Sequence, residues 1–416
     1  MKIAYFTDTF MPELNGVTNT LSKLQTWLDK KNIRYAFFAP DYKRNSATDD
    51  MSASTDATDQ LSSDILSADI SYANADFHHN RIHRFRGIKT SLSPESCLAF
   101  PRYREVFELC DKFKPDLVHV VTELGIGYRG MKYARSRGLP LVMSYHTDYC
   151  KYLQFFHLDF LRPMIEKYLT WFYRSAHRIL APSRYTLEQL FQKQYRNLGL
   201  WSRGIDAEKF NPRFRSRKWR KALGIDDKFV FLYVGRLSPE KGLDMLLYAI
   251  EEIETRFPGK AAFVLTGGGP YGDFILKKNF PHVILTGFKT GPELSEIYAS
   301  ADCFAFPSGT ETFGNAPLEA MASRLPVAGI ASGGVMEFLS HGKNALLCAD
   351  GDQETFTENL IAIMENKTLR RDLAETGRKL ARSRAWDMIF DDLLSVYSGL
   401  IADKQNTLGS GCRDAS

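Results

Sequence analysis

A chain of 416 residues with 44% hydrophobic and 13% aromatic residues is long enough for two globular domains, which excludes a disordered or fibrous protein. Its formal net charge of +5 is uneven, because residues 45–76 hold seven Asp and no Lys or Arg, leaving 54 cationic against 42 acidic residues elsewhere. That excess of +12 favours anionic ligands or an anionic membrane surface, with an ordinary solvated basic surface as the alternative.

Targeting signals and cysteines point to the cytoplasm. No apolar run approaches the ~20 residues that span a bilayer, and acidic and polar residues near the N-terminus interrupt any signal-peptide core. The six cysteines are scattered without a C-x-x-C pair, which favours reduced thiols over a zinc site or a disulfide framework.

The first half of the chain alternates strand-like and helix-like segments, as expected of a parallel sheet flanked by helices. Residues 3–7 and 35–39 predict strands on either side of a helix over 18–30. A Ser-, Thr-, Asp- and Ala-rich stretch over 45–76 predicts a disordered insertion after the second strand. Ordered structure is predicted to resume near 81–85, followed by helix 102–113, strand 117–121, strand 139–144, helix 163–176, strand 178–181 and a helix from Ser183.

The second half repeats this alternation more regularly and predicts another α/β unit. Its predicted strands are 229–234, 262–265, 283–286, 303–306 and 327–330. The predicted organisation is an N-terminal domain over 1–200, a C-terminal domain over 201–385, a terminal helix over 386–402 and a disordered tail over 403–416. The sequence therefore predicts an α/β fold with two Rossmann-like domains.

The strongest functional motif is S-G-T-E-T-F-G-N-A-P-L-E-A over 308–320, where a strand ends, a loop turns and a helix begins. Pro317 stands in the first helical turn, a position that proline favours. Free N–H groups of Gly314, Asn315 and Ala316, together with the helix dipole, would form an anion site suited to a pyrophosphate.

Two carboxylates of this motif, Glu311 and Glu319, stand on either side of the turn. Glu319 is placed to accept hydrogen bonds from ribose hydroxyls, and Glu311 to hold sugar hydroxyls. The alternative is that both are ordinary acids at a helix N-terminus, where the dipole favours negative charge.

Three weaker signals also follow predicted strands. Arg236 and Lys241 lead from a strand into a helix, where charge-assisted bonds to phosphate oxygens are stronger than neutral ones. Gly16 opens the first helix and permits close approach of a ligand, although a plain turn is the simpler interpretation. His146 follows a strand at the edge where α/β sheets bind ligands, but a lone histidine is more often a structural hydrogen-bonding group.

These signals occur in one order in two successive α/β units, and the chain thereby resembles the retaining glycosyltransferases of family 4, whose GT-B fold has two Rossmann-like domains facing across a cleft. The resemblance covers nearly the whole chain except the Asp-rich insertion and the tail. It is closest to the branch with GDP-mannose-dependent α-mannosyltransferases and sulfolipid or diacylglycerol glycosyltransferases. Its motifs are F-T-D-T-F over 6–10 with N-G-V over 15–17, S-Y-H-T over 144–147, R-G-I-D over 203–206, G-R-L-S-P-E-K-G over 235–242 and the 311–319 motif.

The resemblance implies a role for each candidate residue. The implied catalytic residues are His146, Arg236, Lys241 and Glu311. The implied substrate-binding residues are Gly16, Thr312, Phe313, Gly314, Asn315 and Glu319. Retention would proceed by front-face attack without a side-chain nucleophile, with electrostatic stabilisation of the departing diphosphate. The family usually has two glycines where this chain has Asn15 and Gly16.

The implied reaction moves a hexose from GDP-mannose or a UDP-hexose to a glycolipid or cell-envelope acceptor, and the terminal helix packs back on the N-terminal domain. No cofactor and no metal are expected, because Arg236 and Lys241 can neutralise the diphosphate; the D-G-D triplet over 350–352 resembles an ordinary turn of the family. The alternatives are a GT-B-type sugar-nucleotide epimerase and a non-catalytic nucleotide-sugar-binding protein.

The expected partners are the nucleotide-sugar donor and a lipid or glycan acceptor. Nucleic acid is not expected, since no recognition motif accompanies the positive charge. The stretch R-F-R-S-R-K-W-R-K over 213–221 mixes cations with aromatic residues. A solvated helix is the simpler interpretation, and peripheral contact with an anionic membrane at its inner face is the alternative.

Overall fold

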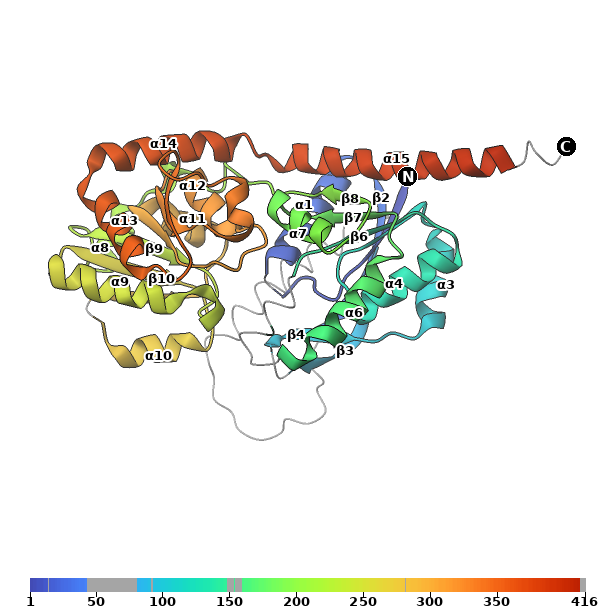
Figure 1. The fold of residues 1–416 in the computed structure, drawn as a ribbon, viewed down its shortest axis with the longest axis horizontal. Helices are drawn as coiled ribbons and strands as arrows, with labels where there is room; N and C mark the ends of the chain where they lie inside the picture. Colours follow the sequence, from blue (N-terminus) through green and yellow to red (C-terminus); the bar gives the residue numbers. More distant parts are fainter. Residues whose placement is uncertain are drawn as a thin grey trace. The chain divides into compact units, whose positions relative to one another are not determined.

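The computed structural model describes residues 1–13, 15–42, 81–90, 93–147, 153, 159–280 and 282–411, drawn in Figure 1. The predicted insertion over 45–76 lies outside the described residues. Contacts divide the chain into two compact units. Unit 1 comprises residues 1–146, 169–179 and 394–416, and unit 2 comprises residues 147–168 and 180–393.

An eight-stranded sheet has the order β4-β3-β2-β1-β5-β6-β7-β8. β1 pairs in parallel with β2 and β5, as do β2 with β3 and β5 with β6, whereas β3 and β4 are antiparallel. Its strands are β1 (Lys2–Phe6), β2 (Arg34–Asp41), β3 (Arg81–Thr90), β4 (Ser93–Ala99), β5 (Leu117–Val120), β6 (Leu141–Ser144), β7 (Arg178–Ala181) and β8 (Leu198–Leu200). The helices described in this part of the chain are α1 (Gly16–Lys30), α3 (Tyr103–Phe113), α4 (Gly125–Ser136), α6 (Arg162–Tyr173) and α7 (Arg184–Gln192).

Helix α4 packs directly on the central strand β1 through glycine. A Cβ atom at Gly130 would lie 2.4 Å from Cγ of Phe6, and one at Gly127 would lie 1.8 Å from the carbonyl oxygen of Thr122. Because no side chain fits at these positions, the helix backbone can approach the sheet closely. The sequence analysis did not predict α4.

A six-stranded sheet with the order β11-β10-β9-β12-β13-β14 forms the centre of unit 2, and all its strand pairs are parallel. Val230 and Leu232 of β9 enter one buried cluster, while Phe231 and Tyr233 enter a second. Both faces of this sheet are therefore covered, as expected of a parallel sheet between helices. Its strands are β9 (Phe229–Val234), β10 (Ala261–Thr266), β11 (Val283–Gly287), β12 (Cys303–Phe306), β13 (Val327–Ile330) and β14 (Ala345–Cys348).

The helices of unit 2 connect these strands or follow the last of them. They include α8 (Arg217–Ala222), α9 (Leu243–Arg256), α10 (Tyr271–Lys278), α11 (Gly291–Ser300), α12 (Asn315–Ala322), α13 (Gln353–Glu365) and α14 (Lys367–Arg382). Two 3₁₀ turns bear on the site: η3 (Pro239–Lys241) and η4 (Gly333–Glu337).

The final helix, α15, spans Trp386–Gly411, so residues 403–411 are helical where the sequence predicted a disordered tail. Extending an existing helix costs little, and this allows its polar, glycine-containing end to remain helical. Tyr397 of this helix is buried in unit 1, where its hydroxyl is 2.5 Å from Nδ1 of His119. Burial lowers the pKa of His119 to about 3, so its imidazole is neutral at physiological pH.

The packing of α4 predicts opposite effects of one substitution at two helical glycines. Gly130→Ala should destabilise the protein by about 1–3 kcal/mol, because the new methyl group overlaps Phe6. Gly399→Ala in α15, where no atom lies within 4 Å of the added Cβ, should instead stabilise it by about 0.5–1 kcal/mol. Denaturation midpoints measure both changes, and a Gly130→Ala protein as stable as the wild type would contradict the packing.

Candidate functional site

Two predicted site residues meet at the carboxyl ends of neighbouring strands in unit 2. β9 and β12 are adjacent, so the loops that follow them emerge at the same edge of the sheet. Nζ of Lys241 donates a hydrogen bond to Oε1 of Glu311 at 2.7 Å, with side chains only 15% and 24% exposed. The structure therefore brings an ammonium and a carboxylate from two separate motifs into direct contact.

Further bonds fasten the 235–242 loop to the 308–314 loop. The hydroxyl of Thr310 donates to the carbonyl oxygen of Glu240 at 3.1 Å. Gly242 has a φ of 68°, and a Cβ atom there would lie 2.2 Å from the carbonyl oxygen of Pro307. Glycine is thus required both for the left-handed backbone and for this close approach.

Arg236 lies at the mouth of the same loop. Its side chain is 52% exposed, and Nη1 is 3.6 Å from Oε1 of the buried Glu240. The backbone carbonyl of Arg236 accepts a hydrogen bond from the hydroxyl of Tyr233 at 2.7 Å. The backbone is therefore held while the guanidinium is about half exposed to solvent.

The helix that follows the loop, α12, begins without a side-chain cap. Gly314 is its N-cap residue with a φ of 88°, and among the described residues there is no side-chain cap hydrogen bond at this N-terminus. Uncapped N–H groups at a helix N-terminus attract anions. Phe313 is buried and packs on Phe338 with ring centroids 5.2 Å apart, so only its backbone is available to a ligand.

The glycine pair Gly333 and Gly334 packs against the backbone of the 308–314 loop. The sequence analysis did not predict this contact. The N–H of Gly334 donates to the carbonyl oxygen of Glu311 at 2.6 Å. Cβ atoms at Gly333 and Gly334 would lie 2.5 Å from the Glu311 carbonyl oxygen and 1.9 Å from that of Thr312. The Thr312 carbonyl also accepts a hydrogen bond from the hydroxyl of Ser183 at 2.9 Å. A Gly-Gly pair separated by two residues from the predicted strand 327–330 was the available signal.

Glu319 has a buried partner that the sequence analysis also missed. The hydroxyl of Tyr298, on α11, donates to Oε2 of Glu319 at 2.9 Å. Tyr298 is fully buried, and burial together with the Glu319 carboxylate raises the pKa of its hydroxyl well above the usual range. The hydroxyl thus stays protonated and fixes one carboxylate oxygen of Glu319.

The remaining predicted residues lie in unit 1. Gly16 is the exposed first residue of α1, whose N-terminus is capped by the side chain of Asn15. His146 follows β6 and is 9% exposed. The preceding strand is held by Ser144, whose hydroxyl is 2.6 Å from Nε2 of His119 and whose carbonyl accepts from the hydroxyl of Tyr173 at 2.9 Å.

Asp8, from the F-T-D-T-F motif, holds the N-terminus of α4. Its carboxylate accepts hydrogen bonds from the N–H groups of Leu124 at 3.0 Å and Ile126 at 2.7 Å. Burial raises the pKa of Asp8, and these N–H bonds oppose that rise. This motif residue therefore has a structural role that spacing alone did not reveal.

The D-G-D triplet serves the fold. Asp352 caps α13 by accepting a hydrogen bond from the N–H of Thr355 at 3.0 Å. Asp350 lies beside the site loop, since a Cβ at Gly309 would be 2.5 Å from its carboxylate. Within the described part of the chain, no group of three or more His, Cys, Asp or Glu side chains is arranged to hold a metal ion.

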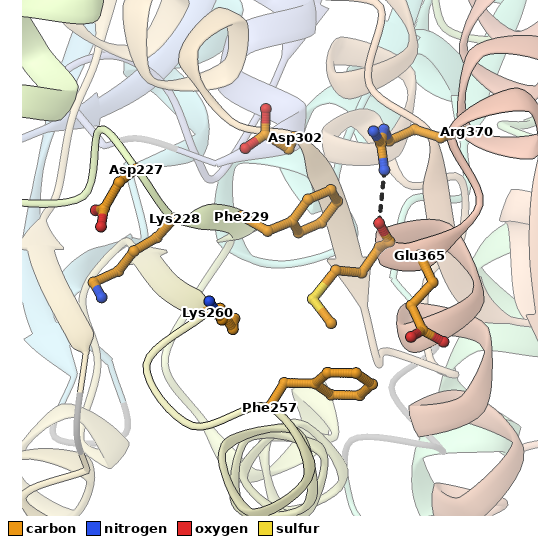
Figure 2. Close-up of a pocket in the computed structure, with 9 residues that line it drawn as sticks. Asp227, Lys228, Phe229, Phe257, Lys260, Asp302, Glu365 and Arg370 are labelled. Carbon is orange, nitrogen blue, oxygen red and sulfur yellow. Dashed lines mark hydrogen bonds between the residues drawn. The ribbon is translucent and has the colours of Figure 1, made fainter.

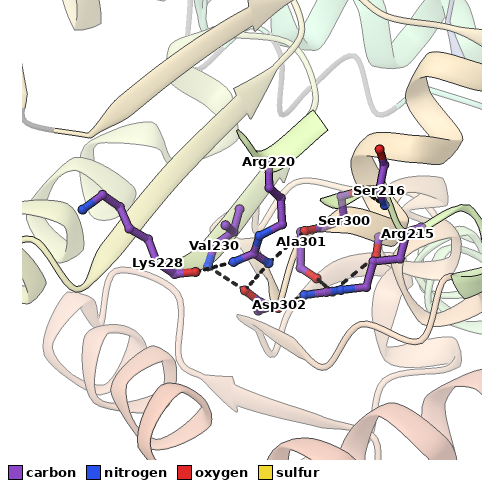
Figure 3. A network of polar contacts seen from close by, with 9 residues as sticks. Arg215, Ser216, Arg220, Lys228, Val230, Ser300, Ala301 and Asp302 are labelled. Carbon is purple, nitrogen blue, oxygen red and sulfur yellow. Dashed lines mark hydrogen bonds and ion pairs between the residues drawn. The ribbon is translucent and has the colours of Figure 1, made fainter. Parts of the chain in front are cut away.

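Two cations of the 213–221 stretch are tied to the fold (Figure 3). Nη1 of Arg220 lies 2.9 Å from Oδ2 of Asp302, and Nη2 of Arg215 lies 2.6 Å from Oδ1. The N–H of Val230 donates to the same Asp302 carboxylate at 2.9 Å. Arg220 is buried and therefore belongs to the fold, whereas the side chain of Arg215 is 48% exposed.

A hollow of about 460 Å³ lies at the other edge of the six-stranded sheet (Figure 2). Its walls include Phe229 and Lys260, which lie at the amino ends of β9 and β10. Nη1 of Arg370 donates to the carbonyls of Ile363 and Met364 at 2.9 and 2.8 Å. Because parallel sheets bind ligands at the carboxyl ends of their strands, the Lys241–Glu311 contact marks the better candidate site.

Comparison with solved structures identifies the fold of the protein. HepE of Anabaena, solved with UDP and glucose, is 20% identical, with a TM-score of 0.69 and with 96% of this chain and 100% of that chain covered. This likeness shows the GT-B fold and confirms the predicted α/β class.

Family models name the family more closely. The model described as Glycosyltransferase Family 4 matches residues 14–209, and the model described as Glycosyl transferases group 1 matches residues 215–380. The chain belongs to this family of glycosyltransferases, as its motifs predicted.

Two curated relatives illustrate the range of substrates. A GDP-mannose-dependent alpha-mannosyltransferase of Mycobacterium tuberculosis is 28% identical over 96% of this chain and 97% of its own length. An alpha-monoglucosyldiacylglycerol synthase of Streptococcus pneumoniae is 26% identical over 79% of this chain and 70% of its own length. Among the helices that the structure describes, none combines the length and the apolar character that crossing a bilayer requires.

The Asp302 network predicts a large loss of stability when its carboxylate is removed. Asp302→Ala should cost about 3 kcal/mol, because the buried Arg220 guanidinium loses its counter-charge. The matched control is Glu358→Ala, which removes the exposed partner of Arg256 and should change stability by less than about 1 kcal/mol. Urea denaturation compares the two, and equal losses would show that the network contributes no more than a surface pair.

Proposed function

We propose that the protein is a retaining hexosyltransferase that transfers a hexose from GDP-mannose or a UDP-hexose to a glycolipid or cell-envelope acceptor, without a metal or a cofactor. The observation that carries the proposal is the Lys241–Glu311 contact at the uncapped start of α12. The names of the relatives support a nucleotide-sugar donor and a lipid acceptor.

In this proposal the site stabilises a departing diphosphate. The Lys241 ammonium and the Arg236 guanidinium supply positive charge, and the N–H groups at the start of α12 supply oriented donors. Such preorganised groups lower the barrier because charge develops on the leaving phosphate in the transition state. Glu311 would receive sugar hydroxyls, and His146 would contact the sugar near the reacting carbon, as the family resemblance implies.

The acceptor hydroxyl would attack from the face that the diphosphate leaves. Its proton would pass to an oxygen of the leaving phosphate, so no side-chain nucleophile is required. Arg236 and Lys241 carry the charge that a divalent metal would otherwise supply. We therefore expect transfer to persist when a chelator is present.

A panel of radiolabelled GDP- and UDP-sugars incubated with the protein and a membrane lipid extract tests this function. Transfer puts the label into an organic-extractable product. Label that remains on the nucleotide as a different sugar would instead identify an epimerase. Donor binding with neither transfer nor hydrolysis would identify a non-catalytic binding protein.

Removal of the ammonium should impair the chemical step. Lys241→Met is expected to lower kcat/KM by about 10²–10³, the usual loss for a donor aimed at developing negative charge. Lys289→Met is the matched control, because it removes the ammonium of an exposed pair with Glu293 and should leave kcat/KM unchanged. Steady-state kinetics with the active donor decides, and a Lys241→Met enzyme within about threefold of the wild type would remove Lys241 from the mechanism.

The hydrogen bond from Tyr298 to Glu319 predicts that both side chains affect affinity for the donor through its ribose hydroxyls. Glu319→Ala should weaken donor affinity at least about tenfold, since charge-assisted bonds contribute about 1.5–3 kcal/mol each. Tyr298→Phe should weaken it by a smaller factor, because the carboxylate remains but loses its buried hydrogen bond.

A dideoxyribose analogue of the donor separates this effect from misfolding. It lacks the hydroxyls that Glu319 would bind, so Tyr298→Phe should not alter its affinity. Calorimetric titration measures the affinities of the wild type and of the Tyr298→Phe protein for the donor and for its dideoxyribose analogue. An equal loss for the two donors would mean that Tyr298 acts through general stability and does not position Glu319.

A further inference from the structure

Unit 1 carries a cluster of aromatic rings and cations on α3, α4 and the C-terminal half of α6. We call it the ring face and define it by Tyr103, Tyr128, Arg129, Lys132, Arg135 and Trp171. The ring centroid of Tyr128 is 6.3 Å from that of Tyr103 and 6.0 Å from that of Trp171. Figure 1 shows α3 and α4 beside each other in this unit.

Cations are interleaved with these rings. Cζ of Arg129 lies 4.7 Å from the ring centroid of Tyr103 and 5.6 Å from that of Tyr128. Nζ of Lys132 lies 5.7 Å from the Tyr128 centroid. Arg129 also donates to the carbonyl of Pro101 at 3.0 Å, which fixes its guanidinium between the two rings.

The ring face is accessible at its rim, while Tyr128, Arg129 and Lys132 at its centre are half-buried. Tyr103 and Trp171 are each 42% exposed, and the neighbouring Phe100 and Leu124 are 60% and 39% exposed. Phe100 lies against the start of α4, since a Cβ at Gly125 would be 2.9 Å from its ring. Large apolar groups exposed together in this way indicate a surface that binds something.

The charge of the ring face is positive. Helix α4 contains no Asp or Glu, and Arg129, Lys132 and Arg135 recur along it at helical spacing. Helix α3 contributes three acids: Glu108 is paired with Arg104 at 2.8 Å, Asp111 is paired with Arg137 at 2.5 Å, and Glu105 in the first turn is exposed. The three cations of α4 outnumber Glu105, so the surface combines interfacial aromatic rings with a net positive charge.

We propose that the ring face binds the surface of an anionic membrane. Tyr and Trp rings settle at the level of lipid headgroups, and each nearby Lys or Arg adds attraction to anionic lipid. This location differs from the 213–221 stretch, whose Arg215 and Arg220 are tied to Asp302.

The position of the ring face suits a lipid acceptor, an argument that depends on the proposed function. Helix α4 follows β5 directly, so its first turn, with Tyr128, lies at the carboxyl edge of the unit 1 sheet. Parallel sheets bind ligands at that edge. A membrane held there would present its headgroups next to the binding edge, so the acceptor would not have to leave the bilayer completely.

Flotation with lipid vesicles tests the ring face without any need for activity. The full-length protein should float with vesicles of phosphatidylglycerol and phosphatidylcholine, and should bind much less to phosphatidylcholine alone. Lys132→Gln/Arg135→Gln should weaken binding on the order of tenfold, because each cation near the surface contributes. Trp171→Ala should weaken it as well.

Helix α10 offers matched controls. Lys277→Gln/Lys278→Gln removes the same charge, and Phe274→Ala removes an aromatic ring that is also 42% exposed. Both control proteins should bind vesicles like the wild type, and circular dichroism checks that every variant is folded. Binding that survives the ring-face substitutions, or that is lost in the α10 controls, would overturn the proposal.

Two further outcomes keep this proposal separate from the proposed function. If the protein floats with vesicles but transfers no sugar, the ring-face proposal stands and the proposed transferase function is wrong. If the protein glycosylates a detergent-dispersed acceptor but does not float with vesicles, the proposed transferase function stands and the ring-face proposal is wrong. Binding to native membranes that disappears with purified lipids would assign the ring face to a protein partner and overturn the membrane proposal.

Discussion

The candidate site depends on one geometric constraint, the adjacency of two parallel strands whose following loops must pass each other at very short range. β9 and β12 end side by side, and the chain after β9 crosses the end of β12 where only glycine at position 242 avoids the carbonyl of Pro307. This crossing places the Lys241 ammonium against the Glu311 carboxylate. A bulkier residue at 242 would separate the two loops and the two charges with them.

Around this crossing, two of the candidate site residues are supported by neighbouring parts of unit 2. The backbone of Glu311 rests on the glycine pair at 333 and 334, and the carboxylate of Glu319 is fixed by the buried Tyr298. Supports of this kind hold reactive groups in position before a substrate arrives, which lowers the cost of ordering them on binding.

The sequence predicted much of this, and the physical reasons for its omissions are specific. Strand periodicity identified β1, β9 and β12, and the loop-to-helix turn identified Glu311 and Glu319. The sequence analysis did not predict α4, because glycines such as Gly130 weaken its apolar periodicity. The close contact between this helix and Phe6 nevertheless requires glycine there. The roles of Asp8, Tyr298 and the Asp302 network depend on partners far away in the chain, which no local pattern reveals.

The ion pair between Lys241 and Glu311 has a consequence for turnover under the proposed function. A donor brings both a phosphate for the ammonium and sugar hydroxyls for the carboxylate, so both members of the pair exchange one partner for another. A spent nucleoside diphosphate no longer brings sugar hydroxyls for Glu311, but its terminal phosphate carries an additional negative charge beside Arg236 and Lys241. Because the ammonium has three N–H donors, Lys241 can hold that phosphate and the Glu311 carboxylate together, and the pair would then keep the carboxylate in place for the next donor.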